Sequence, residues 1–123
     1  MRFMLLVKAR QAAGETAKPP NPDWLETMRS YNDRLEQAGV LLASGHLHPA
    51  SSGIRIGCGA YGDSTDIEEG LRGKAGADVA SFALVDVRSK EEAIEWAVRL
   101  PDVGRIGVGE IELRRVKEMP DIF

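Results

Sequence analysis

The segment Gly39–Arg55, with the sequence GVLLASGHLHPASSGIR, decides the fold because it contains one strand, a turn and the start of a second strand. The apolar residues Val40–Ala43 predict one strand. A second strand is predicted at Ile54–Cys58, where apolar residues alternate with other types. Between them, Gly45–Pro49 contains two histidines and a proline and favours a turn. The middle of the chain therefore supplies two strands to a sheet.

Two amphipathic helices are predicted on either side of these strands, near residues 22–38 and 90–99. The first begins with Asn21 as its N-cap and ends at Gly39, a residue suited to the left-handed conformation after a helix. The second begins with a capping box, Ser89 to Glu92. The apolar stripe of the first helix is Trp24, Met28, Tyr31, Leu35 and Ala38, and that of the second is Ala93, Ile94, Ala97 and Val98.

Three further strands complete the expected sheet, at Phe3–Val7, Val79–Val87 and Gly107–Val116. The first is apolar on both faces, which is typical of a central strand buried on both sides. With at most five strand segments, the order β-α-β-β-α-β predicts a ferredoxin-like α+β fold.

One face of such a sheet is covered by the two helices, and the other face also needs cover because Phe3–Val7 is apolar on both sides. A second copy of the chain is the economical cover. We therefore expect a homodimer, a dimeric α+β barrel with an apolar sheet-to-sheet interface.

The chain has 123 residues, 43% of them hydrophobic and 28% charged, and a net charge of −3. This composition predicts a single globular domain over residues 1–123. Scattered lysines and arginines argue against nucleic acid as a partner. No apolar run approaches the roughly 20 residues of a membrane helix, and the run after Met1 is too short for a signal peptide. The single cysteine, Cys58, excludes an internal disulfide, is expected to be buried or half-buried, and fits a reducing cytoplasm.

The segment Gly57–Ala77 is rich in glycine and poor in large apolar residues. We expect Gly59–Ala77 to be the least regular part of the chain, exposed and mobile, with at most a short helical turn at Glu68–Lys74.

Several segments together resemble the YCII-related family, in its DGPF subgroup. The matching segments are Met1–Lys8, Met28–Ala43, Leu47–Ser52 (LHPASS), Ser81–Pro101 and Gly109–Phe123. The subgroup's Asp-Gly-Pro-Phe motif should follow between Ile56 and Val79, but this stretch has a different sequence. Two explanations are open: divergence of a surface loop, or a pair of compensating frameshifts. Under either one, the motif's aspartate has no counterpart here.

The two histidines of the turn, His46 and His48, are the candidate catalytic residues, because histidine is the natural general acid or base near neutral pH. His48 occupies a position where the family carries His or Gln, which also suits a hydrogen-bonding ligand contact. Arg55 and Ser51 are candidate ligand-binding residues, Arg55 for an anion. No Cys or Asp stands beside the histidines at ligand spacing, so we expect neither a metal nor a cofactor.

The wider YCII group, which includes a dehydrochlorinase, is associated with a His–Asp pair. Here Tyr31 stands near the histidine position on the first helix, and Leu100–Asp102 covers the aspartate position, so the pair is not recognisable. We therefore expect a homodimer that binds or responds to a small molecule. The alternative is a lyase- or dehydrochlorinase-like enzyme with His48 as base, and a third hypothesis is a purely structural or interaction domain.

Overall fold

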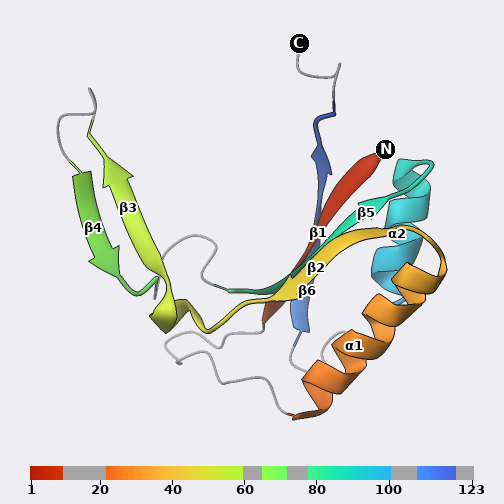
Figure 1. The fold of residues 1–123 in the computed structure, drawn as a ribbon, viewed down its shortest axis with the longest axis horizontal. Coiled ribbons are helices and arrows are strands. Elements are labelled where there is room, and N and C mark those ends of the chain that lie inside the picture. The colour runs from red at the N-terminus through yellow and green to blue at the C-terminus, as the bar shows by residue number, and fades with distance from the viewer. Residues whose placement is uncertain (10–21, 60–64, 72–77, 101–107, 119–123) are drawn as a thin grey trace.

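A four-stranded antiparallel sheet with the strand order β2-β5-β1-β6 forms the centre of the fold, with two helices on one face (Figure 1). The computed structural model describes residues 1–9, 22–59, 65–71, 78–100 and 108–118. This strand order, with the helices α1 and α2 between strands, agrees with the expected ferredoxin-like α+β fold. The elements of this layer are β1 (Arg2–Ala9), α1 (Pro22–Gln37), β2 (Leu41–His46), β5 (Val79–Asp86), α2 (Lys90–Val98) and β6 (Val108–Val116).

Strand β1 lies between β5 and β6, so the prediction of a central strand is confirmed. Its odd-numbered residues Phe3, Leu5 and Val7 are buried beneath the helices. Its even-numbered residues Met4 and Leu6 lie on the opposite face and are only half-buried. We call this second side, away from the helices, the open sheet face. The alternation of a strand thus divides one apolar segment between the core and a face that neither described helix covers.

Helix α1 ends in a Schellman motif at Gly39, as the sequence predicts. The Gly39 amide donates to the Glu36 carbonyl at 3.0 Å, and the Val40 amide donates to the Leu35 carbonyl at 3.1 Å. Gly39 has a φ of 75°, a conformation that costs other residues steric energy. This turn directs the chain from the helix into β2.

The buried side of α1 is made by Met28, Tyr31 and Leu35, which confirms the central part of the predicted stripe. Ala38 is exposed, so its assignment to the stripe is wrong. It follows the last helical residue, where the chain is already turning away from the sheet. The Asn21 cap and the Trp24 side chain lie outside the described residues.

Helix α2 begins with the predicted capping box. The Ser89 hydroxyl accepts a hydrogen bond from the Glu92 amide at 3.1 Å, and the Glu92 carboxylate accepts one from the Arg88 amide at 2.8 Å. The carboxylate thus reaches one residue further back than the usual N-cap amide.

The predicted apolar stripe of α2 is only half right. Ala93 and Ala97 are buried, but Ile94 and Val98 are 44% and 72% exposed. Successive residues in a helix are rotated by about 100°, so the two pairs form neighbouring stripes. The helix presents the alanine stripe and Leu100 to the core, because small side chains allow close approach to the sheet.

A separate hairpin, β3 (Ile54–Cys58) and β4 (Thr65–Glu69), stands apart from the main sheet (Figure 1). The expectation of at most five strands is therefore wrong, as is that of a helical turn beginning at Glu68. Strand β4 is stabilised by the cross-strand pairing of Ile67 with Ile56. It was missed in the sequence because Ile67 is the only apolar residue of this strand, so no alternating pattern was visible. The other residues of the segment expected to be irregular, 60–64 and 72–77, lie outside the description.

The hairpin exposes its apolar side chains. Arg55 is half-buried, whereas its apolar neighbours Ile54 and Ile56 are exposed. Cys58 is exposed as well, which contradicts its expected burial. The reason is that the apolar side of this hairpin has no core beneath it within the described chain.

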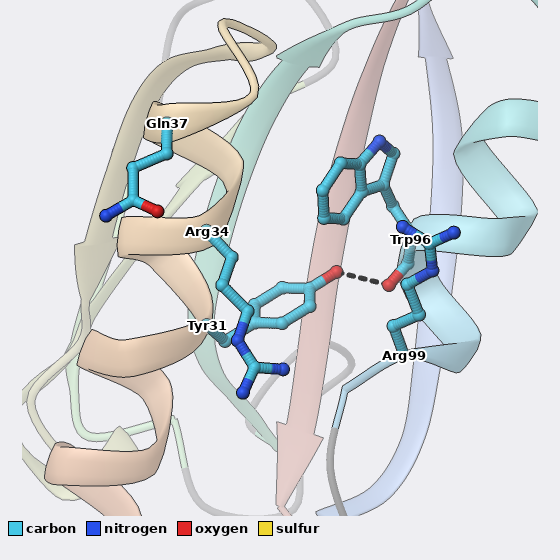
Figure 2. Close-up of a pocket in the computed structure, with 5 residues that line it drawn as sticks. All are labelled: Tyr31, Arg34, Gln37, Trp96 and Arg99. Carbon is cyan, nitrogen blue, oxygen red and sulfur yellow. Dashed lines mark hydrogen bonds between the residues drawn. The ribbon is translucent and has the colours of Figure 1, made fainter.

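The two helices are joined by Tyr31, which is 1% exposed. Its hydroxyl donates a hydrogen bond to the backbone carbonyl of Trp96, near the end of α2 (Figure 2). Burial raises the pKa of Tyr31 to about 12, although the positive charge of Arg99 acts in the opposite direction. The phenol is therefore neutral and fixed as a donor at physiological pH.

Neither helix of the described chain is long and apolar enough to cross a membrane.

We predict that Gly39→Ala lowers the free energy of unfolding by about 1–2 kcal/mol, the cost of a left-handed conformation. No atom lies within 4 Å of the position of the added Cβ, so backbone strain alone is measured. Urea unfolding provides the measurement, and Gly39→Asn is the matched control because asparagine tolerates this conformation better. Equal stability of the alanine variant and the parent protein would contradict the motif.

We predict that the free energy of unfolding falls between pH 10 and about 12 because of Tyr31. In this range the unfolded chain has lost the phenolic proton and the folded protein still holds it, so rising pH favours unfolding. Tyr31→Phe should remove this contribution. Denaturant unfolding of both proteins across the range tests it, and parallel pH profiles for the two would show that the hydroxyl is not protected.

Candidate functional site

The turn that follows β2 forms a small hollow of about 240 Å³. The turn continues into a short 3₁₀ helix, Ala50–Ser52, and His48 is the ionisable residue of the hollow's wall. Leu71, which follows β4 closely, packs beside Gly53 in the wall of the hollow. A side chain at position 53 would collide with the Leu71 side chain. The lining residues are Leu47, His48, Pro49, Ala50, Ser52, Gly53, Leu71 and Val79.

The structure does not bring the other predicted site residues into this hollow. His46 is the last residue of β2, not part of the turn, and it is exposed and pairs across the sheet with Ser81. Ser51 is exposed on the 3₁₀ helix, and its neighbour Ser52 lines the hollow instead. The catalytic and ligand-binding roles of these residues stay predictions.

Arg55 is held within the hairpin by two carboxylates of β4. Its guanidinium lies 3.3 Å from the Asp66 carboxylate and 3.1 Å from that of Glu68. The hydrogen bond to Glu68 raises the pKa of Arg55 above its usual value. An anionic ligand would therefore compete with two carboxylates already present at this side chain.

A larger groove, of about 420 Å³, lies between α1 and α2. We call it the helix groove, and its lining residues are Tyr31, Arg34, Gln37, Trp96 and Arg99 (Figure 2). The hydrogen bond from Tyr31 to the Trp96 carbonyl crosses between the helices and fixes their spacing at this point. The groove is thus built on elements whose relative position is set by the core.

The helix groove has a positive character. Arg34 lies on α1 and Arg99 directly follows α2, so the two guanidinium groups lie on opposite sides of the groove (Figure 2). The Arg99 guanidinium lies over the Trp96 ring, 5.0 Å from its centroid. Among the residues that the structure describes, no carboxylate pairs with Arg34 or Arg99. Within the described ranges, neither guanidinium has the carboxylate partners that hold Arg55.

Sequence reasoning missed the arginines of the helix groove. A signal was present, because Tyr31, Arg34 and Gln37 follow each other at intervals of three and share one helix face. Trp96 and Arg99 repeat this spacing at the end of α2. Each set alone is ordinary for a solvated helix surface, and only the packing of α1 beside α2 gives them a common groove.

Within the described ranges, no three His, Cys, Asp or Glu side chains come together as metal ligands.

The fold is also that of a solved enzyme. The 5-chloro-2-hydroxyhydroquinone dehydrochlorinase (TftG) from Burkholderia phenoliruptrix AC1100, in complex with 2,5-dihydroxybenzoquinone, superposes with a TM-score of 0.51. The similarity covers 95% of this chain and 94% of that chain, at 16% sequence identity. At this identity the likeness shows a shared fold. No curated protein sequence matches the chain.

The sequence itself gives the closer assignment. The YCII-related domain matches residues 1–120, nearly the whole chain. The DGPF subgroup is not confirmed by this match. The protein therefore belongs to the YCII-related domain family.

Proposed function

We propose that the protein binds a small anionic molecule in the helix groove. The observation that carries this proposal is the pair of guanidinium groups, Arg34 and Arg99, which face the groove without a carboxylate partner in the described chain. Guanidinium groups form strong, directional hydrogen bonds with carboxylates and phosphates. Two of them from different helices suit a ligand that spans the groove.

The other groove residues fit binding better than proton transfer. Tyr31 stays protonated at neutral pH, and its hydroxyl proton is used in the bond to the Trp96 carbonyl. Trp96 supplies an apolar face, and the Gln37 amide offers both a donor and an acceptor. A ligand with an aromatic or unsaturated ring and an acidic group matches these surroundings. Such a ligand would contact both α1 and α2, as a regulatory ligand that links two elements does.

We predict that Arg34→Gln and Arg99→Gln each weaken binding of benzoate or inorganic phosphate by about tenfold, the value of one charged hydrogen bond. Isothermal titration calorimetry measures the affinities. Arg29→Gln is the matched control, because Arg29 is exposed on the same helix and does not line the groove.

Equal loss in all three variants would point to a general charge effect, and unchanged affinity in the two groove variants would contradict the proposal. A tryptophan fluorescence change that is lost together with affinity would support contact at Trp96.

An alternative proposal is a dehydrochlorinase-like lyase with His48 as general base. It is supported by the place of His48 in the hollow after β2 and by the activity named for the enzyme of similar fold. In such a reaction the hydroquinone would lose HCl overall: the imidazole would accept a ring hydroxyl proton, tautomerisation would place a proton on the carbon that bears chlorine, and chloride would then leave with a second hydroxyl proton as a quinone forms. The helix groove carries no histidine among its lining residues, so the two proposals concern different places.

We predict for this alternative that chloride release from 5-chloro-2-hydroxyhydroquinone is abolished in His48→Ala and retained in His46→Ala. His46 is a matched control since it is exposed nearby and does not line the hollow. A chloride electrode follows the reaction. Absence of release by the parent protein, or equal rates in His48→Ala, would reject the lyase.

We also propose that the protein acts as a homodimer through its open sheet face. Support comes from the half-buried residues on this side, which have no covering layer in the described chain. They are Met4, Leu6, Phe82 and Leu84. The ring of Phe82 also lies over Gly45, where an added Cβ would approach it to 2.8 Å. This contact extends the apolar surface toward β2 and makes it suitable for a second sheet.

A further inference from the structure

The wall of the helix groove carries positive charge and, among its described residues, no negative charge. Two arginines, a tyrosine, a glutamine and a tryptophan line it, with no aspartate or glutamate between them. The Tyr31 phenol is neutral at physiological pH, because burial raises its pKa to about 12. The two charges of this wall are therefore those of Arg34 and Arg99.

These two charges stand apart. Arg34 lies in the last turn of α1 and Arg99 directly follows α2, and their side chains lie on opposite sides of the groove (Figure 2). The free carbonyls at the C-terminal end of a helix attract cations, which holds each guanidinium at its own helix end. A ligand with one charged centre would have to draw both side chains together against this attraction. A ligand with an acidic group at each end meets them where they lie.

Arg99 is held in place before a ligand binds. Its guanidinium lies over the Trp96 ring, 5.0 Å from the centroid, and the ring itself packs against the core. No carboxylate of the described chain pairs with this guanidinium. A restricted guanidinium loses less conformational entropy when a carboxylate binds its N–H donors.

The groove has room for more than a single ion. Its volume of about 420 Å³ falls within the range of about 300–1,000 Å³ that is typical of small-molecule sites. Between the two arginines, the rings of Tyr31 and Trp96 supply apolar surface (Figure 2). This wall suits a ligand whose charged ends are joined by an apolar middle.

We infer that the helix groove takes a dicarboxylate, with one carboxylate at Arg34, the other at Arg99 and an apolar middle between them. This inference rests on the proposed function and names the class of the ligand. A molecule of this class would join α1 to α2 beside the hydrogen bond from Tyr31 to the Trp96 carbonyl.

Two ligands of the same shape isolate the second charge. Terephthalate and para-toluate share a benzoate ring and differ only in whether the opposite position bears a carboxylate or a methyl group. We expect terephthalate to bind about tenfold or more tightly than para-toluate, the value of a further charged hydrogen bond. Isothermal titration calorimetry at fixed ionic strength measures both affinities.

Arginine variants show where the preference originates. Arg34→Gln and Arg99→Gln should each reduce the preference for terephthalate by about tenfold, because one guanidinium is then left for two carboxylates. Arg29→Gln is the matched control and should keep the full preference, since Arg29 is exposed on α1 and does not line the groove. Circular dichroism verifies that each variant is folded.

Glu95 offers a variant with the opposite sign. It stands four residues before Arg99, a spacing at which a carboxylate attracts a guanidinium, but it is exposed and does not line the groove. Glu95→Gln should raise the preference for terephthalate by about twofold, the value of one such helix pair. A fall in the preference would contradict the inference, and a folding defect cannot produce the expected rise.

The outcomes separate the ligand class from the site. Equal affinities for terephthalate and para-toluate, both weakened by Arg34→Gln and Arg99→Gln, would overturn the dicarboxylate and leave the anion site intact. Absence of binding of both ligands to the parent protein would reject the anion site and this inference with it.

Discussion

The structure depends on strand β1, which is paired on both edges and apolar on both faces. Its residues Phe3, Leu5 and Val7 form the floor of the core on which α1 and α2 pack. The same alternation forces Met4 and Leu6 onto the other side, which neither of the described helices covers. One segment of sequence thus creates both the rigid platform for the helices and the open sheet face, which we propose as the dimer surface.

The platform in turn determines the candidate site. Because α1 and α2 pack against the same face of one sheet, residues of both helices line one groove. The Tyr31 hydroxyl joins the two helices by its hydrogen bond to the Trp96 carbonyl. The groove above this bond gathers cations that would be unremarkable on isolated helices. Arg55 of the hairpin differs from the groove arginines, because its guanidinium already forms ion pairs with Asp66 and Glu68.

Local signals were sufficient for much of the fold. Gly39 and Ser89 mark the helix boundaries through backbone conformation and capping, which need only neighbouring residues. Predictions failed where distant contacts decide. Ile94 and Ala93 are neighbours in sequence, but the approach of α2 to the sheet selects the alanine for burial. The helix groove was missed for the same reason, because Arg34 and Arg99 belong together only after both helices have packed.

Anion binding in the helix groove is tested most directly by nuclear magnetic resonance of the arginine Nε–H and tryptophan indole N–H groups during titration with benzoate. We expect concentration-dependent shifts of the Arg34, Arg99 and Trp96 signals, with the Arg55 signal unchanged because its guanidinium is held by carboxylates. Shifts at Arg55 with none at Arg34 and Arg99 would contradict the account.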